Sequence, residues 1–153
     1  MPLDATDRAI LAILQDDARI TNNELAEAVH LSPSACLRRV RRLEEQGVID
    51  RYVTLVDAGA IGRPTTVFVE ISLASQEERH LDAFETQVID RPEVVSCHLM
   101  AGNADYLVQV RCADVEDYER IHRTHLALLP GVTRIRSSFS LRTVCQRTAL
   151  PLD

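Results

Sequence analysis

The first third of the chain places apolar residues at helical spacing in short segments. In residues 5–15, apolar side chains recur three and four positions apart behind Asp4, a residue type that favours the N-cap position. Thr21 and Glu24 form a capping-box pair, which predicts a second helix of roughly two turns over residues 21–29. The pattern therefore predicts two helices, of which the second is short.

A third helix is predicted directly after a tight turn at His30 and Leu31. Glycine is common at the position of His30, because a positive φ is convenient there. Ser32 supplies a hydroxyl N-cap, Pro33 suits the first helical position, and Gly47 ends the helix. The buried face of this helix is formed by Cys36, Val40 and Leu43. A short helix, a turn and a second helix are the parts of a helix-turn-helix.

The rest of the chain alternates between strand and helix patterns. Residues 48–56 are rich in β-branched residues and predict an extended strand or a linker. Beyond a boundary near residues 59–64, the pattern predicts the order strand, helix, strand, strand, helix, strand. The predicted ranges are 65–73, 78–89, 94–100, 105–112, 115–129 and 133–144. This is the order of a ferredoxin-like βαββαβ domain, an antiparallel sheet with both helices on one face.

We therefore predict an α+β protein of two small domains. Residues 1–52 form a winged-helix-like helix-turn-helix domain, residues 53–64 a linker strand and hinge, and residues 65–153 a ferredoxin-like domain. The sheet face without helices needs cover, and we assign Ile135 and Phe139 of the last strand to it. We expect a second copy of the chain to bury that face, so the protein itself is a predicted partner, at least as a dimer.

Composition places the chain among ordinary globular proteins, with 46% hydrophobic and 26% charged residues. It lacks an apolar run of the roughly 18 residues that a membrane helix needs, and its start is acidic, unlike a signal peptide. We expect a cytoplasmic protein with no membrane partner. Its four cysteines are scattered singly, which is typical neither of a disulfide framework nor of a zinc knuckle.

The net charge of −6 argues against a nucleic-acid partner, but the arginines are unevenly distributed. Residues 31–43, on the predicted third helix, hold several arginines and no acidic residue, so we expect double-stranded DNA as a partner. The predicted DNA-binding residues are Ser32, Ser34, Ala35, Arg38, Arg39, Arg42 and Arg51. Because the start of a recognition helix points into the major groove, we expect Ser34, Ala35 and Arg38 to face base edges. The other three arginines are expected to contact phosphates.

Several motifs carry a resemblance to a known family. They are LDATDRAIL (residues 3–11), DARITN (17–22), LSPSACLRRVRRLE (31–44), GVI (47–49), CHLMAGNADYL (97–107) and LPGV (129–132). Through them the chain resembles the leucine-responsive regulatory protein and asparagine regulator family, Lrp/AsnC, over essentially its whole length. The resemblance implies a DNA-binding regulator whose ferredoxin-like domain dimerises, assembles further into a tetramer or octamer, and binds a small amino-acid effector between dimers.

By resemblance, the effector site is the hairpin loop over residues 102–106. A glycine hairpin offers backbone N–H and C=O groups to a zwitterion, and Asp105 can pair with its ammonium group. The predicted effector-binding residues are Met100, Ala101, Gly102, Asn103, Asp105, Tyr106, Arg136 and Ser137. Asn103 stands where the family often carries Asp. With no second acid nearby, the expected ligand is a neutral amino acid.

Two other classes of protein are alternatives to the regulator. Siroheme decarboxylases resemble this architecture and use histidines, but the chain has no Trp and lacks an aromatic surface of tetrapyrrole size. His122 and His125 share one helix face without a nearby carboxylate pattern, and His98 has no evident catalytic partner. We therefore expect no catalytic residues, no cofactor and no metal site. A non-DNA-binding interaction module is the other alternative, and the arginine-rich helix argues against it.

Overall fold

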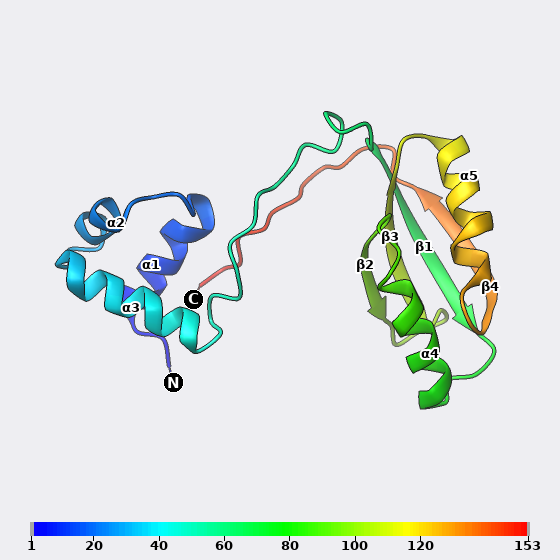
Figure 1. Cartoon of the computed structure of the whole chain (residues 1–153), viewed down its shortest axis with the longest axis horizontal. Coiled ribbons are helices and arrows are strands. Elements are labelled where there is room, and N and C mark those ends of the chain that lie inside the picture. Colours follow the sequence, from blue (N-terminus) through cyan, green and yellow to red (C-terminus); the bar gives the residue numbers. More distant parts are fainter. Residues whose placement is uncertain (1, 153) are drawn as a thin grey trace. The chain divides into compact units, whose positions relative to one another are not determined.

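The computed structural model describes residues 2–152, which form two compact units (Figure 1). Unit 1 comprises the described residues up to Leu55 together with those from Val144 onward, and unit 2 comprises residues 56–143. The predicted second domain includes all residues from 65 onward. The structure groups the final segment with unit 1, because that segment packs on the first helix.

The helices of unit 1 begin at the predicted caps. They are α1 (Ala5–Asp16), α2 (Asn22–Ala28) and α3 (Pro33–Glu45). The side chains of Asp4, Thr21 and Ser32 each accept the backbone N–H of the residue three positions on. In α1 and α2 the capping box is complete. His30, in the turn before α3, has φ +56°, the left-handed conformation expected there.

The core of unit 1 is small and draws on every one of these helices. The buried residues are Ile10, Leu11, Leu25, Ala26, Cys36 and Leu43. Val40 packs against them while partly exposed, so the apolar stripe predicted for the third helix is confirmed. Leu152, near the end of the chain, also packs against this core.

The segment after α3 is a linker rather than a strand. No strand precedes Thr65 among the described residues. Near its start, the Tyr52 hydroxyl donates a 2.9 Å hydrogen bond to the Glu44 carboxylate at the end of α3. Burial, together with this carboxylate, raises the pKa of Tyr52 to about 12. The linker is thereby fastened to unit 1 where it leaves α3.

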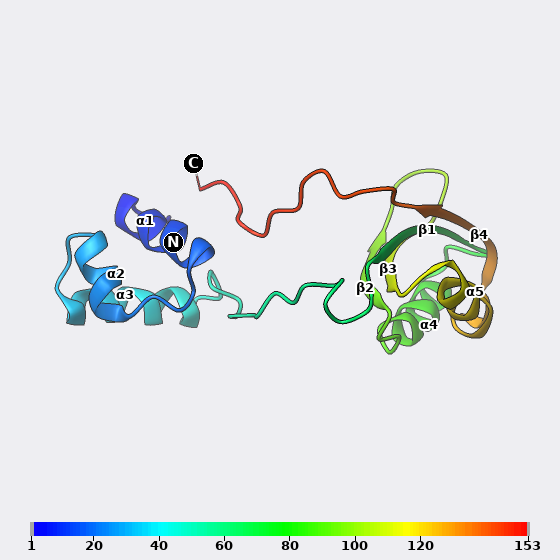
Figure 2. The ribbon, with the colours of Figure 1, turned by 90° about the horizontal axis from the view of Figure 1, so that it is seen from above.

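Unit 2 has the predicted ferredoxin-like order. Its elements are β1 (Thr65–Leu73), α4 (Glu78–Val88), β2 (Val94–Leu99), β3 (Tyr106–Cys112), α5 (Val115–Thr124), a 3₁₀ turn η1 (Leu126–Leu128) and β4 (Val132–Phe139). The sheet order is β2-β3-β1-β4, and each neighbouring pair is antiparallel. Both helices lie on one face of the sheet (Figure 2).

The core of unit 2 lies between the sheet and these helices. Strands β1 and β3 alternate buried residues toward the helices with less buried ones on the other face. Phe84 of α4 stacks on the ring of Tyr106, with ring centroids 4.3 Å apart. The Tyr106 hydroxyl donates a 2.7 Å hydrogen bond to Glu85, so this buried phenol is satisfied.

The open face of the sheet is more polar than expected. Ile135 pairs with the buried Ile71 and packs against the core, and the ring of Phe139 contacts Tyr118 of α5 edge-on. Both residues therefore lie on the helix-covered face, and their assignment to the open face is wrong. The open face carries Phe68, which is 41% exposed.

Two element boundaries differ from the prediction by five residues. The last strand ends at Phe139 instead of residue 144: the Ser140 N–H still donates to the Thr66 carbonyl of β1, 2.9 Å away, and the chain then leaves the sheet. The helix predicted to reach residue 129 ends at Thr124 and continues as the 3₁₀ turn. Leu126 and Leu129 are both buried, and the three-residue periodicity of a 3₁₀ turn places them on one side.

None of the helices in the described part of the chain is both long and apolar enough to span a membrane.

Two valines of unit 2 form a matched test of this core. Val88 is 1% exposed and Val115 is 65% exposed, and both lie in helices. We expect Val88→Ala to lower the free energy of unfolding of unit 2 by about 2 kcal/mol, because it leaves a cavity. Val115→Ala should change it by less than about 0.5 kcal/mol. Chemical denaturation followed by circular dichroism measures both, and equal effects would contradict this core.

Candidate DNA-binding and effector-binding sites

The exposed start of α3 carries the residues predicted to face DNA bases. Ser32, Ser34 and Arg38 are exposed, and Ala35 is half-buried. The Ser32 hydroxyl lies 3.3 Å from that of Ser34 and caps the helix through the Ala35 N–H. The structure thus presents hydroxyl groups and a guanidinium on one exposed turn. Arg41, one turn further along, is exposed as well.

Arg39 and Arg42 point instead toward α1. Arg39 Nη1 lies 2.8 Å from Asp7 Oδ1 and 2.7 Å from Asp4 Oδ2, and Arg42 Nη2 lies 2.7 Å from Asp7 Oδ2. Asp7 is 1% exposed, so its carboxylate depends on these cations. The two arginine side chains stay 28% and 34% exposed. Contact with phosphates by these arginines remains a prediction.

This ionic cluster, Asp4, Asp7, Arg39 and Arg42, was missed by sequence reasoning. Its members lie 32 to 35 positions apart in the chain, and only the packing of α1 against α3 brings them together. The available signal was Asp7 itself, a second acid in the first turn of a helix whose N-cap is already acidic. The hydrogen bond from Arg39 lowers the pKa of Asp4, helped by the backbone N–H of Asp7.

A side-chain contact links the two helices of the helix-turn-helix. The Asn22 side-chain amide donates a 2.9 Å hydrogen bond to the carbonyl of Pro33, which joins the starts of α2 and α3.

Arg51, after α3, is 76% exposed in its side chain, and its contact is a 3.6 Å pair with Asp50. Arg51 is therefore free to reach another anion.

The predicted effector loop is an exposed hairpin between β2 and β3. The Met100 N–H donates to the Asp105 carbonyl, 2.8 Å away, which closes the hairpin. The loop residues Met100, Ala101, Gly102 and Asn103 are exposed. Their backbone groups are thus accessible to a ligand.

Asp105 holds this hairpin against the end of β1. Asp105 is 8% exposed, and its two carboxylate oxygens accept hydrogen bonds from the Leu73 N–H and the Gln76 side-chain amide, each 2.6 Å long. The Asp105 N–H donates to the Ile71 carbonyl, 3.0 Å away. The expected pairing of Asp105 with an ammonium group would add to these internal contacts. Gln76 was not singled out from the sequence.

The other predicted effector residues are separated by the sheet. Arg136 is exposed on the open face and lies 3.6 Å from Glu70. Ser137 faces the helices and hydrogen-bonds to the Tyr118 hydroxyl. Tyr106 is buried with its ring in the core. Within one chain, a single ligand can therefore meet Arg136 or Ser137 but not both, since they lie on opposite faces of β4.

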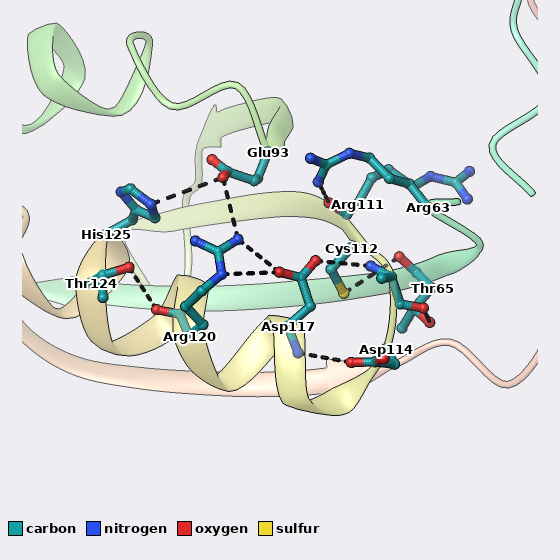
Figure 3. Close-up of polar contacts among 11 residues, drawn as sticks. Arg63, Thr65, Glu93, Arg111, Cys112, Asp114, Asp117, Arg120, Thr124 and His125 are labelled. Atoms are coloured by element: carbon teal, nitrogen blue, oxygen red, sulfur yellow. Dashed lines mark hydrogen bonds and ion pairs between the residues drawn. The ribbon is translucent and has the colours of Figure 1, made fainter. Parts of the chain in front are cut away.

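The histidines belong to separate surroundings. His98 is exposed on β2, and the ring of His122 contacts the ring of Tyr118 edge-on. His125 Nε2 lies 3.9 Å from Glu93 Oε1, an oxygen that Arg120 approaches to 3.8 Å (Figure 3). Among the described residues no group of three or more His, Cys, Asp or Glu side chains is placed to hold a metal ion.

Arg120 also links the polar cluster in Figure 3 to the start of α5. It contacts Asp117 at 2.7 Å, and Asp117 accepts the Ala113 N–H at 3.0 Å. This backbone hydrogen bond, followed by that from Arg120, lowers the pKa of Asp117. The cluster fastens α5 to the loop before β2, which is a structural task.

A capped helix-turn-helix with an exposed basic turn, joined to a ferredoxin-like domain with an open hairpin, defines a DNA-binding regulator with a ligand-binding domain. The family model described as winged helix-turn-helix DNA-binding matches residues 3–50. The model described as Lrp/AsnC ligand binding domain matches residues 66–150. The chain belongs to the Lrp/AsnC family of transcription regulators.

Relatives in sequence and structure agree with this assignment. The Bkd operon transcriptional regulator of Pseudomonas aeruginosa is 41% identical over 98% of each chain. The leucine-responsive regulatory protein of Escherichia coli is 40% identical over 97% of this chain and 90% of its own. A Neisseria meningitidis transcriptional regulator in complex with L-Met superposes with a TM-score of 0.94 at 36% identity, covering 99% of this chain and 98% of that one.

The ion pair of Asp4 gives a testable pH dependence. Because its pKa is lowered below 3.8 in the folded state, it stabilises unit 1 above that pH, and the contribution is lost as the pH falls through the folded pKa. Asp4→Asn keeps a good N-cap but removes the charge. We expect the variant to be less stable than the wild type at pH 6, and the difference to shrink as the pH falls through the folded pKa of Asp4, in denaturation monitored by circular dichroism.

Asp50→Asn is the matched control, since Asp50 is 84% exposed in its side chain. It should follow the wild type across the whole pH range. An Asp4→Asn deficit that stayed constant down to the lowest pH would contradict a role for the charge.

Proposed function

We propose that this regulator binds double-stranded DNA with the exposed start of α3 and that a small neutral amino acid bound at the hairpin over residues 100–106 modulates the binding. The observation that carries the DNA-binding part is the exposure of Ser34 and Arg38 on the first turns of a capped helix. A recognition helix reads base edges with side chains at this end. The proposal agrees with the predicted cytoplasmic location, where chromosomal DNA is accessible.

The arginines divide into two sets in this proposal. Arg38 is unobstructed and reads bases, together with Ser34 and Ala35. Arg39 and Arg42 are held by Asp7 and offer their remaining N–H groups to phosphates, which their partial exposure supports. Arg51 contacts a phosphate from beyond the helix.

DNA binding should respond differently to two arginine substitutions. Arg38→Ala is expected to reduce the preference for a selected operator over random DNA by about 5- to 150-fold, the effect of losing one base contact. Arg51→Ala should weaken both DNAs alike and lower the slope of log affinity against log salt by about 1. Fluorescence anisotropy on both DNAs at several salt concentrations gives these values.

Arg79→Ala is the control, because Arg79 is 75% exposed in its side chain on α4 of unit 2. It should leave DNA affinity unchanged. If the wild type bound no DNA even at low salt, the interaction module would replace the regulator. If Arg38→Ala left the operator preference intact, the docking of α3 would be wrong.

The effector part of the proposal rests on the hairpin. Exposed backbone groups at Ala101 and Gly102 suit a zwitterion, and Asn103 can hydrogen-bond a polar side chain. Asp105 supplies the negative charge for the ammonium group. The Neisseria relative was solved with L-methionine, which is a neutral amino acid. The site lacks a second acid for lysine or arginine.

Assembly completes the proposal. Phe68 on the open sheet face and Val53, Leu55 and Val56 of the linker are 41%, 62%, 69% and 62% exposed. Exposed apolar residues on a sheet face and on a linker mark candidate interaction surfaces. We infer a dimer, with higher assembly to a tetramer or octamer, that covers them and places the effector between dimers. Two-fold symmetry also matches symmetric half-sites on DNA.

Calorimetric titration of the twenty amino acids tests the effector site. The wild type should bind a neutral amino acid saturably, and Asp105→Ala should abolish binding. Gln76→Ala removes one internal hydrogen bond but keeps the Asp105 charge, so it should retain binding if that charge holds the ligand. Asp82→Ala, exposed on α4, is the control.

Two outcomes would contradict the site or the ligand class. Undiminished binding in Asp105→Ala would overturn the site. Saturable binding of lysine or arginine alone would overturn the neutral class.

A further inference from the structure

Residues near the C-terminal end of the described chain dock on α1, within unit 1. The Gln15 side chain and the backbone of Leu150 form a reciprocal pair: the amide donates to the Leu150 carbonyl at 3.1 Å, and the Leu150 N–H donates to Gln15 Oε1 at 2.7 Å. Two residues further on, Leu152 is half-buried and packs against the core of unit 1. The tail is thus held by a polar and an apolar contact together.

In the polar contact, Gln15 binds the backbone of Leu150 and not its side chain. A carboxamide pairs with one residue's N–H and C=O in the way a neighbouring strand does. The Leu150 side chain is 71% exposed and takes no part. Pro151 restricts Leu150 to extended conformations, so the tail is partly preorganised for this contact.

Helix α1 therefore carries two different attachments. Its first turn holds Arg39 and Arg42 of α3 through Asp7, and its last turn holds the tail through Gln15. The tail follows β4, the strand that bears Arg136 of the proposed effector site. A single rigid helix of 12 residues connects the two attachments.

We propose that the Gln15 end of α1 is a docking surface for the chain's own C-terminal segment, residues 149–152, and that this docking couples β4 to the recognition helix. The docking part stands on the contacts of unit 1 alone. The coupling part rests on the proposed function, because it requires an amino acid that changes DNA affinity.

A matched pair of variants at Leu150 tests the docking. Leu150→Pro deletes the N–H that Gln15 accepts, whereas Leu150→Ala deletes the exposed side chain and keeps the N–H. Trypsin cleavage after Arg147 releases the C-terminal peptide, and its rate follows the undocked population. We expect about fivefold faster release from Leu150→Pro, the effect of losing one hydrogen bond, and an unchanged rate from Leu150→Ala. Equal rates for wild type and Leu150→Pro would overturn the docking.

Co-expression of two defective chains shows whose tail docks. Gln15→Ala loses the surface and Leu150→Pro loses the tail contact, so each should release its peptide quickly when expressed alone. If tails dock within their own chain, trypsin releases both peptides from mixed assemblies as quickly as from each variant alone. Slow release of the Gln15→Ala tail in the mixture would mean exchange between copies and would overturn docking within one chain.

The coupling is measured as the ratio of DNA affinities with and without L-methionine, on a fragment that the wild type selects from a random pool. Coupled sites typically give ratios of about 5- to 150-fold. Leu150→Pro should reduce the ratio by at least about threefold, and Leu150→Ala should preserve it. An undiminished ratio in Leu150→Pro would overturn the coupling. If methionine leaves the wild-type DNA affinity unchanged, the ratio is measured with the other neutral amino acids in turn. A wild type that ignores all of them would contradict the effector part of the proposed function and the coupling with it, while the trypsin rates still decide the docking.

Discussion

One buried carboxylate organises the DNA-binding unit. Asp7 is almost fully removed from water, and such a charge is tolerated only when paired and hydrogen-bonded. Its partners are Arg39 and Arg42, one turn apart on α3. Arg38 and Arg41 are exposed because they lie on the side of α3 opposite the apolar stripe of Cys36, Val40 and Leu43. The basic stripe of the sequence is thereby divided into an inner pair that fixes the helix and an outer pair that remains accessible.

The sequence predicted best what is local. Caps at Asp4, Thr21 and Ser32 follow from contacts three residues apart, and β1 follows from strict alternation, so these were correct. What depends on distant partners was not predictable. The ionic cluster, the fastening of Asp105 by Gln76 and the return of the tail to α1 each join residues far apart in sequence. The end of β4 was predicted five residues too late, because the sequence does not show where the chain leaves the sheet.

The same limit applies to the candidate sites. Exposure of the first turns of α3 followed from the apolar stripe, since the opposite side must face solvent. In the hairpin, the motif located the loop but did not indicate that the Asp105 carboxylate accepts hydrogen bonds from within the chain. Arg136 and Ser137 were grouped by adjacency along the chain, whereas a strand sends adjacent side chains to opposite faces. Motifs locate a segment, and the pleat and the packing decide which atoms of that segment a ligand can reach.

The return of the tail to unit 1 has a consequence for how the chain is made. The three helices of unit 1 are synthesised before unit 2, but the segment that covers the end of α1 is synthesised after it. At usual rates of translation, roughly 4 to 17 seconds separate the end of the linker from the start of the tail. The DNA-binding unit therefore spends that interval with part of its apolar surface open, and it is completed only after unit 2 has been synthesised. A ribosome that stalls within unit 2 leaves a helix-turn-helix that has its caps and ion pairs but lacks the tail that packs on α1.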